Sequence, residues 1–261
     1  MSKNNPVLIG GGVASNQSVY EVVTTARHDP GTRAFLPDGR MFEYVRSQNS
    51  TAIEHGKLAT YEPMVAAADQ IAPEAAAAGA TSVTLSSVAI TFTKNELVGG
   101  FLNIEATAGE GELYEIIGNE ASTATSDMVV TLGRGIVTAL TTSSDVSIVT
   151  GPTAVKISAA VTAQATAAEV AAGVPLVDIP AGDTTNQYFW VQKTGLASVL
   201  FGTVVGAVGE AVYHGENAGS FQAMTMDHAD TTDRDEKMAL GVIFSILPVD
   251  TEYFVVNLQI A

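Results

Sequence analysis

The feature that most constrains the fold is a succession of short strand-forming runs from about residue 78 to the C-terminus. Those before residue 172 include TSVTLSS, GGFLNIEAT, GELYEIIGN and MVVTLG, and those after it include QYFWVQKTG, ASVLFGTVV and EYFVVNLQIA. Runs rich in Val, Ile, Thr and aromatic residues, separated by Gly, Asn and Ser, are typical of β-sandwiches and β-barrels. We therefore expect an all-β (mainly β) fold with two small sandwich or barrel domains, at 78–172 and 173–261.

The first 77 residues lack this regular pattern. They contain Gly10-Gly11-Gly12, a polar run at 15–18, and an alanine-rich stretch that Pro63 and Pro73 interrupt. Proline removes a backbone donor and breaks helices, so this stretch predicts a linker with one helical turn at most. We interpret residues 1–77 as an extended N-terminal arm and linker.

One tight hairpin is predicted inside this arm, in the segment FLPDGRMFEYVRS at 35–47. Pro37 presets the turn and Asp38-Gly39 is a strong hairpin dipeptide, because glycine tolerates positive φ. A two-stranded hairpin alone is marginal in water. We therefore expect it to lean on another surface.

Two interpretations of that surface stay open: the hairpin binds a neighbouring protein, or it packs on its own β-body. Side chains alternate along a strand, so Phe42 and Tyr44 share one face while Glu43 and Val45 share the other. Arginine and aromatic residues are enriched in interface cores. The interface candidates are Arg33, Phe35, Arg40, Phe42, Tyr44 and Arg46.

The charge distribution separates the two parts of the chain. Residues 1–60 hold six basic and five acidic residues, for a net charge of +1. Residues 61–261 have a net charge of −17, so the whole chain has −16. A strongly acidic body repels the phosphate backbone, so we expect no nucleic-acid partner.

The sequence contains few features that indicate a cellular compartment. Cysteine is absent, which excludes disulfides and thiolate metal sites. No apolar run approaches the roughly 20 residues of a membrane span, and the N-terminus lacks a signal-peptide pattern. We expect synthesis in a cytoplasm and no membrane association.

No constellation of residues predicts catalysis, a cofactor or a metal centre. The histidines are scattered at His28, His55, His214 and His228, without the i, i+4 spacing of a helix-borne metal site. The acidic run at 226–237 lacks the ligand pattern of an EF-hand, so a solvated loop is favoured. We predict that the protein is not an enzyme. The alternative is a hydrolase whose site is assembled from residues distant in the sequence.

The single tryptophan, Trp190, lies in the run Tyr188-Phe189-Trp190. A lone tryptophan belongs more often to a core than to a ligand platform, so we expect it buried or at a subunit contact. A module that binds host-surface glycan would instead need Trp190 and Tyr213 exposed around a pocket.

Three segments are distinctive in combination: LPDGRMFEYVRS, GGFLNIEATAGEGELYEIIGN and VPLVDIPAGDTTNQYFWVQKTGLASVLF. Their combination, ahead of a glycine-rich final barrel, resembles virion structural proteins of tailed bacteriophages. It is most similar to the head decoration, or cement, proteins found among marine phages.

This resemblance implies a non-enzymatic role on the outer surface of the expanded capsid. Such proteins bind the major capsid protein, often as trimers, and brace the shell against internal pressure. The N-terminal arm would then contact the major capsid protein or neighbouring protomers. A tail or vertex adhesin that binds host glycan is the alternative from another class.

Overall fold

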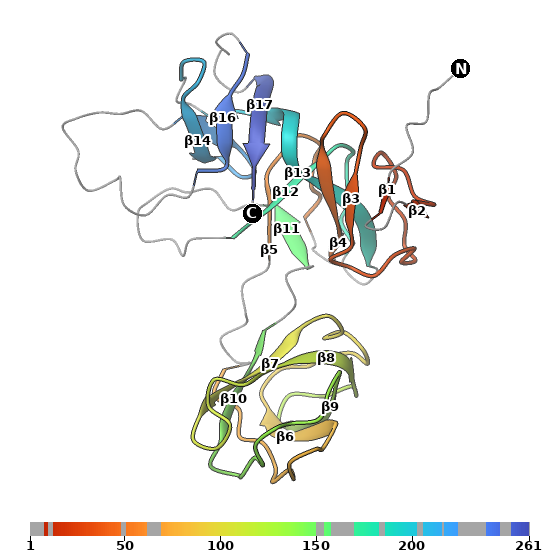
Figure 1. The fold of residues 1–261 in the computed structure, drawn as a ribbon, viewed down its shortest axis with the longest axis vertical. Helices are drawn as coiled ribbons and strands as arrows, with labels where there is room; N and C mark the ends of the chain where they lie inside the picture. Colours follow the sequence, from red (N-terminus) through yellow and green to blue (C-terminus); the bar gives the residue numbers. More distant parts are fainter. Residues whose placement is uncertain are drawn as a thin grey trace, which may run out of the picture. The chain divides into compact units, whose positions relative to one another are not determined.

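The computed structural model describes most of the chain. The described residues are 8–9, 13–47, 51–61, 69–149, 154–157, 170–182, 186–202, 206–215, 217–223, 239–245 and 252–260. They form strands, turns and loops without a helix, which confirms the all-β prediction (Figure 1). None of these residues therefore belongs to a helix able to cross a membrane.

The chain divides differently from the predicted arm and two consecutive domains. One compact unit combines Met1–Glu62 with Thr153–Ala261, and the other is the insertion Pro63–Pro152. The predicted extended arm at 1–77 is wrong, because its strands at 41–47 and 59–61 pair with strands at 187–200 and 171–175. We describe the two units separately, as the discontinuous unit and the inserted unit.

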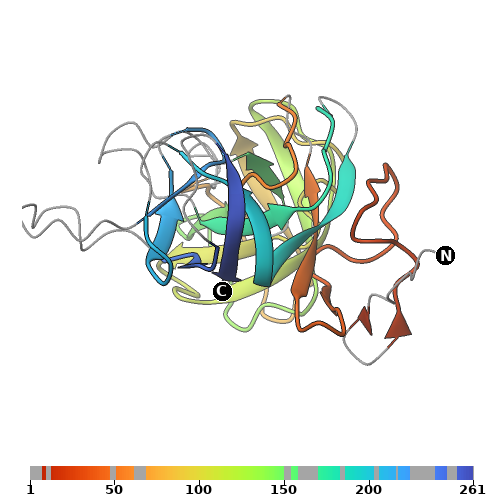
Figure 2. The ribbon, with the colours of Figure 1, turned by 90° about the horizontal axis from the view of Figure 1, so that it is seen from above.

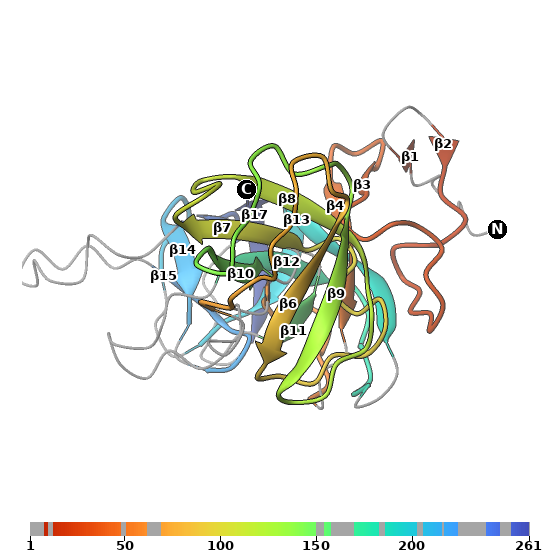
Figure 3. The same cartoon turned by 90° about the horizontal axis from the view of Figure 1, so that it is seen from below.

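The inserted unit is one five-stranded antiparallel sheet, visible in Figure 3. Its strands follow the order β10-β7-β8-β9-β6. Their bounds are β6 (Ser82–Val88), β7 (Phe101–Ala106), β8 (Leu113–Asn119), β9 (Ser126–Leu132) and β10 (Asp145–Val149). Alternate residues face inward, so Met128, Val130 and Leu132 of β9 join a core that includes Tyr114 and Ile148.

A short segment at 71–74 links the two edge strands of this sheet. Ile71 exchanges both backbone hydrogen bonds with Val146 of β10, and Pro73 bridges Leu85 of β6. Proline has no N–H, and the bonds to β6 come from its neighbours: Ala72 accepts from Ser86, and Glu74 donates to Thr84. The stretch that we predicted as a linker thus closes the sheet.

The discontinuous unit contains a 12-stranded sheet. Its strands are β1 (Leu8–Ile9), β2 (Val13–Ala14), β3 (Arg33–Phe35), β4 (Met41–Ser47), β5 (Ala59–Tyr61), β11 (Val155–Ile157), β12 (Ala171–Pro175), β13 (Gln187–Leu200), β14 (Ala211–His214), β15 (Phe221–Ala223), β16 (Gly241–Ile243) and β17 (Tyr253–Gln259). The 14-residue strand β13 organises the unit, because its two halves pair with different strands.

The N-terminal half of β13 belongs to a first ring of strands. β4 pairs β13, β13 pairs β12, β12 pairs β5 and β5 pairs β11, and an isolated bridge from Arg46 to Ala154 returns to β4. Phe189 and Val191 of β13 point into this ring, where they pack with Val45 and Ile53.

The C-terminal half of β13 belongs to a second ring. β13 pairs β17, followed by β16, β14 and β15, and a bridge between Phe201 and Phe221 closes the ring. Figure 2 shows the blue C-terminal strand β17 beside β13. Val199, Phe254 and Val256 lie in its core. All five strands fall within the predicted 173–261 region.

Candidate functional site

The predicted hairpin forms, as β3 and β4. Arg33, Ala34 and Phe35 pair with Glu43, Phe42 and Met41. Gly39 adopts φ of 87° and its N–H donates to the carbonyl of Leu36, 3.0 Å away. The Asp38 side chain accepts bonds from both the backbone and the guanidinium of Arg40. The turn therefore has the chemistry that the sequence indicated.

The aromatic face of the hairpin is turned into the chain's own core. Phe42 and Tyr44 are fully buried and pack with Ala34, Leu36 and Trp190, whereas Val45 points to the other face, into the first ring. β4 is a central strand with β3 on one side and β13 on the other. Of the two open interpretations, packing on its own body is confirmed, and Phe42 and Tyr44 offer no docking surface.

The remaining candidates occupy different environments. Arg33 is exposed, and Phe35 retains 45% of its surface. Arg40 pairs with Asp38 at 2.8 Å and lies over the Phe42 ring, while half-buried Arg46 bridges to Ala154. Arg33 and Phe35, both on β3, are therefore the accessible candidates.

Residues 15–31, which we call the strap, lie across the outer face of β4 and β13. The Tyr44 hydroxyl donates to Gln17 Oε1 at 2.6 Å, and Gln17 Nε2 donates to the Tyr188 carbonyl at 3.1 Å. Val23 exchanges two backbone hydrogen bonds with Tyr188. These bonds tie the strap to two neighbouring strands, β4 and β13, a connection that was not predicted from the sequence.

An aromatic cluster lies under the strap. The Trp190 ring is 4.9 Å from that of Tyr44 and 5.5 Å from that of His28, and Tyr188 stacks on Tyr44. Burial lowers the pKa of His28, an effect that Arg27 strengthens and Asp29 opposes.

Trp190 is fully buried, as predicted for a core tryptophan. A glycan-binding platform built on this side chain would need it exposed. The burial of Trp190 therefore removes the feature that would have favoured an adhesin.

Three polar side chains meet beside the core of the first ring: Lys193, Glu43 and Tyr61. Tyr61 donates to Glu43 Oε1 at 2.8 Å, and Lys193 Nζ lies 3.1 Å from the Tyr61 hydroxyl and 3.6 Å from Glu43 Oε2. Burial lowers the pKa of Lys193, against the opposing effect of Glu43, and burial beside Glu43 raises the pKa of Tyr61.

This trio was not predicted from the sequence. The signal was that Lys193 continues the inward alternation of Phe189 and Val191, and that Glu43 shares a face with Val45. The side-chain exposures of Lys193 and Glu43 are only 2% and 8%. A buried charge needs a partner, and each of these groups supplies one to the others.

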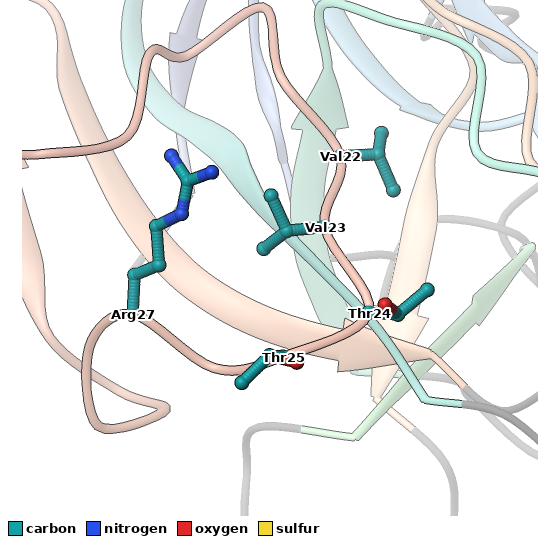
Figure 4. A pocket seen from close by; sticks show the side chains of 5 residues that line it. All are labelled: Val22, Val23, Thr24, Thr25 and Arg27. Atoms are coloured by element: carbon teal, nitrogen blue, oxygen red, sulfur yellow. The ribbon is translucent and has the colours of Figure 1, made fainter.

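A surface hollow lies along the strap (Figure 4). Val22, Val23, Thr24, Thr25 and Arg27 line it, all from one continuous loop. The lining contains no carboxylate or histidine, so it offers no acid or base for a hydrolase.

Metal and histidine candidates add no further site among the described residues. No group of three metal-ligating side chains comes together there, and the acidic run at 226–237 lies outside them. The exposed pair His55 and Asp178, 2.7 Å apart, has Tyr253 stacked on the imidazole.

Comparison with protein-family models, with curated proteins and with solved structures found no match.

Proposed function

We propose that this chain is a non-enzymatic structural protein of a tailed-phage virion, a decoration protein that binds the outer surface of the expanded head. The major capsid protein is its partner, and the chain acts there as an oligomer, with three copies as the expected number. Assembly takes place in the host cytoplasm. The proposal starts from the resemblance of the segments at 36–47, 99–119 and 174–201.

The observation that supports the proposal best is the placement of Arg33 and Phe35. β3 pairs with β4 inside the fold and with β1 outside it, and β1 pairs with β2, which ends the path of this sheet among the described strands. An exposed aromatic residue and an exposed arginine therefore sit on a strand that leads outward from the core. Such residue types recur at interface centres.

The buried ionisable side chains also suit a structural role. The ionisable groups Lys193, Glu43 and Tyr61 satisfy one another inside the first ring. Each of the three closed arrangements of strands has a core of its own, and a decoration protein must above all persist as a folded body.

A binding assay with expanded heads that lack this protein tests the proposal. Phe35→Asp should reduce occupancy of the heads, whereas Leu113→Asp should not, because Leu113 of β8 has a similar exposure of 48% but lies in the inserted unit. Phe42 and Tyr44 are unsuitable test sites, since replacing either buried ring by a small or charged residue would destabilise the core.

Cryo-electron microscopy of the decorated heads supplies the second readout. Density repeated over the outer shell is expected, with β3 near the capsid surface. Density restricted to a vertex or tail, or full occupancy with Phe35→Asp, would overturn the proposal.

A further inference from the structure

The outward face of the second ring is unusually apolar. Strands β13, β17 and β16 alternate, so the residues between the core positions point away from the ring. Leu196, Tyr253 and Phe244 expose 46%, 42% and 59% of their surface. We call this the outer ring face; its apolar members are Leu196, Leu200, Val242, Phe244, Tyr253 and Val255.

Strand register makes these residues one continuous patch. Leu200 lies opposite Tyr253, and Leu196 lies in register with Asn257, which in turn pairs with Val242. The Phe244 N–H donates to the Val255 carbonyl at 2.9 Å, so Phe244 and Val255 are neighbours on adjacent segments of the same face.

The outer ring face carries no charge at the outward strand positions 196, 198, 200, 242, 253, 255, 257 and 259. Its polar members are Ser198, Asn257 and Gln259. By contrast, the outward face of β8 and β9 in the inserted unit places Glu115 and Asp127 among its apolar residues. In a chain of net charge −16, a patch without charge is a specific feature.

Polar groups mark the borders of the patch. At one end His55, which is paired with Asp178, stacks on Tyr253. At the other end the side chain of Arg40 approaches Gly195, next to Leu196. An apolar centre with a polar rim is the anatomy of a protein interface.

Charge favours a second copy of the same chain as the occupant. Two copies that each carry −16 repel one another wherever carboxylates face carboxylates. The outer ring face has no carboxylate at its strand positions, and the carboxylates beside Tyr253 at its border, Glu54 and Asp178, are paired with Lys57 and His55. A basic partner would instead gain from the acidic surfaces elsewhere, and it would gain no electrostatic attraction here.

We propose that copies of this chain associate through the outer ring face, with Leu196, Phe244 and Tyr253, its most exposed large apolar side chains, as the main contacts. Face-to-face sheets pack about 10 Å apart with interdigitated side chains, which Phe244 and Tyr253 are long enough to provide. The inference deepens the proposed function, because it names the surface that holds the oligomer together, but it can be tested without a capsid.

Analytical ultracentrifugation of the full chain over a wide concentration range is the test. The wild-type chain should sediment as an oligomer, and Leu196→Glu and Phe244→Glu should each weaken association about tenfold or more, because they place like charges at the contact. Val129→Glu is the matched control: Val129 is an outward residue of β9 with 39% exposure, so this variant should behave as wild type.

Circular dichroism of each variant establishes that it is folded. A monomeric wild-type chain at every concentration, or equal association of wild type and Leu196→Glu, would overturn the inference. A monomeric chain whose Leu196→Glu variant loses binding to heads would also overturn it, by assigning the face to the capsid. The head-binding assay with Phe35→Asp is separate, so failure of self-association is distinguishable from failure of the proposed function.

Discussion

The hydroxyl of Tyr44 donates a hydrogen bond to Gln17 Oε1 at 2.6 Å, between buried side chains that are 27 positions apart. The same hydroxyl accepts a bond from the backbone N–H of Arg27 at 3.2 Å. One tyrosine of β4 therefore holds the strap at two points. This relationship explains why the N-terminal segment belongs to the folded body.

Replacing Tyr44 by phenylalanine should destabilise the chain by about 1–3 kcal/mol, because the variant leaves buried polar groups of the strap without a partner. Urea denaturation monitored by circular dichroism measures this loss. Tyr20→Phe is the control, since Tyr20 is 59% exposed and its change should leave the midpoint unaltered. Equal midpoints for wild type and Tyr44→Phe would show that the strap does not depend on this hydroxyl.

Local features of the fold could be predicted from the sequence. The turn at Pro37-Asp38-Gly39 and the shared face of Phe42 and Tyr44 follow from short-range rules of turn chemistry and alternation. The burial of Trp190 follows from the preference of tryptophan for a core. The all-β class follows from the density of strand-forming runs.

The pairing of distant strands could not be predicted in the same way. Tyr61 and Lys193 are 132 positions apart, and Gln17 and Tyr188 are 171 apart. Strand propensity shows that a segment can pair, but the choice of partner depends on which edges and faces remain to be buried. The hairpin therefore looked isolated, although its second strand had a long partner in β13.

The buried trio gives a second prediction. Lys193→Met leaves the Glu43 carboxylate buried without its cation, and breaking a buried pair in this way costs about 3–5 kcal/mol. The triple variant Lys193→Met, Glu43→Leu, Tyr61→Phe should recover much of this loss, because well-packed apolar groups replace a buried ion pair at little cost.

Chemical denaturation of the single and triple variants measures both effects. Lys94→Met is the control, since Lys94 and Glu120 form an exposed pair at 3.1 Å and exposed pairs contribute little. If Lys193→Met were as stable as Lys94→Met, the Lys193 charge would not be compensated by Glu43 in the folded chain.

A third prediction concerns Gly195, where β13 passes from the first ring to the second. Its φ is 86°, and a Cβ atom there would lie 2.9 Å from Cγ and 3.3 Å from Cα of Arg40. Gly39 has nearly the same φ, 87°, but no atom within 4 Å of the added carbon.

Gly39→Ala should therefore cost about 1–2 kcal/mol from backbone strain alone, and Gly195→Ala should cost more because Arg40 must also move. Thermal unfolding of the two variants under identical conditions gives the comparison. An equal loss in both would mean that Arg40 yields without cost.

The fourth prediction uses Trp190 as a reporter of the strap. Because burial lowers the pKa of His28 in the folded chain, the unfolded chain binds more protons once the pH falls below about 6.5. The contribution of His28 to stability is thus present at neutral pH and decreases as the pH falls through that value. Trp190, whose ring is 5.5 Å from that of His28, reports unfolding of this part of the chain.

Fluorescence of the single tryptophan during urea unfolding, at neutral pH and at about pH 5, measures this effect. The wild-type chain should lose stability on acidification, with a red shift of the Trp190 emission, and His28→Gln should lose less, because glutamine does not titrate. The remaining histidines are common to both chains, so the difference between them isolates His28. An identical pH dependence in the two chains would place the acid-sensitive contact elsewhere, away from the strap.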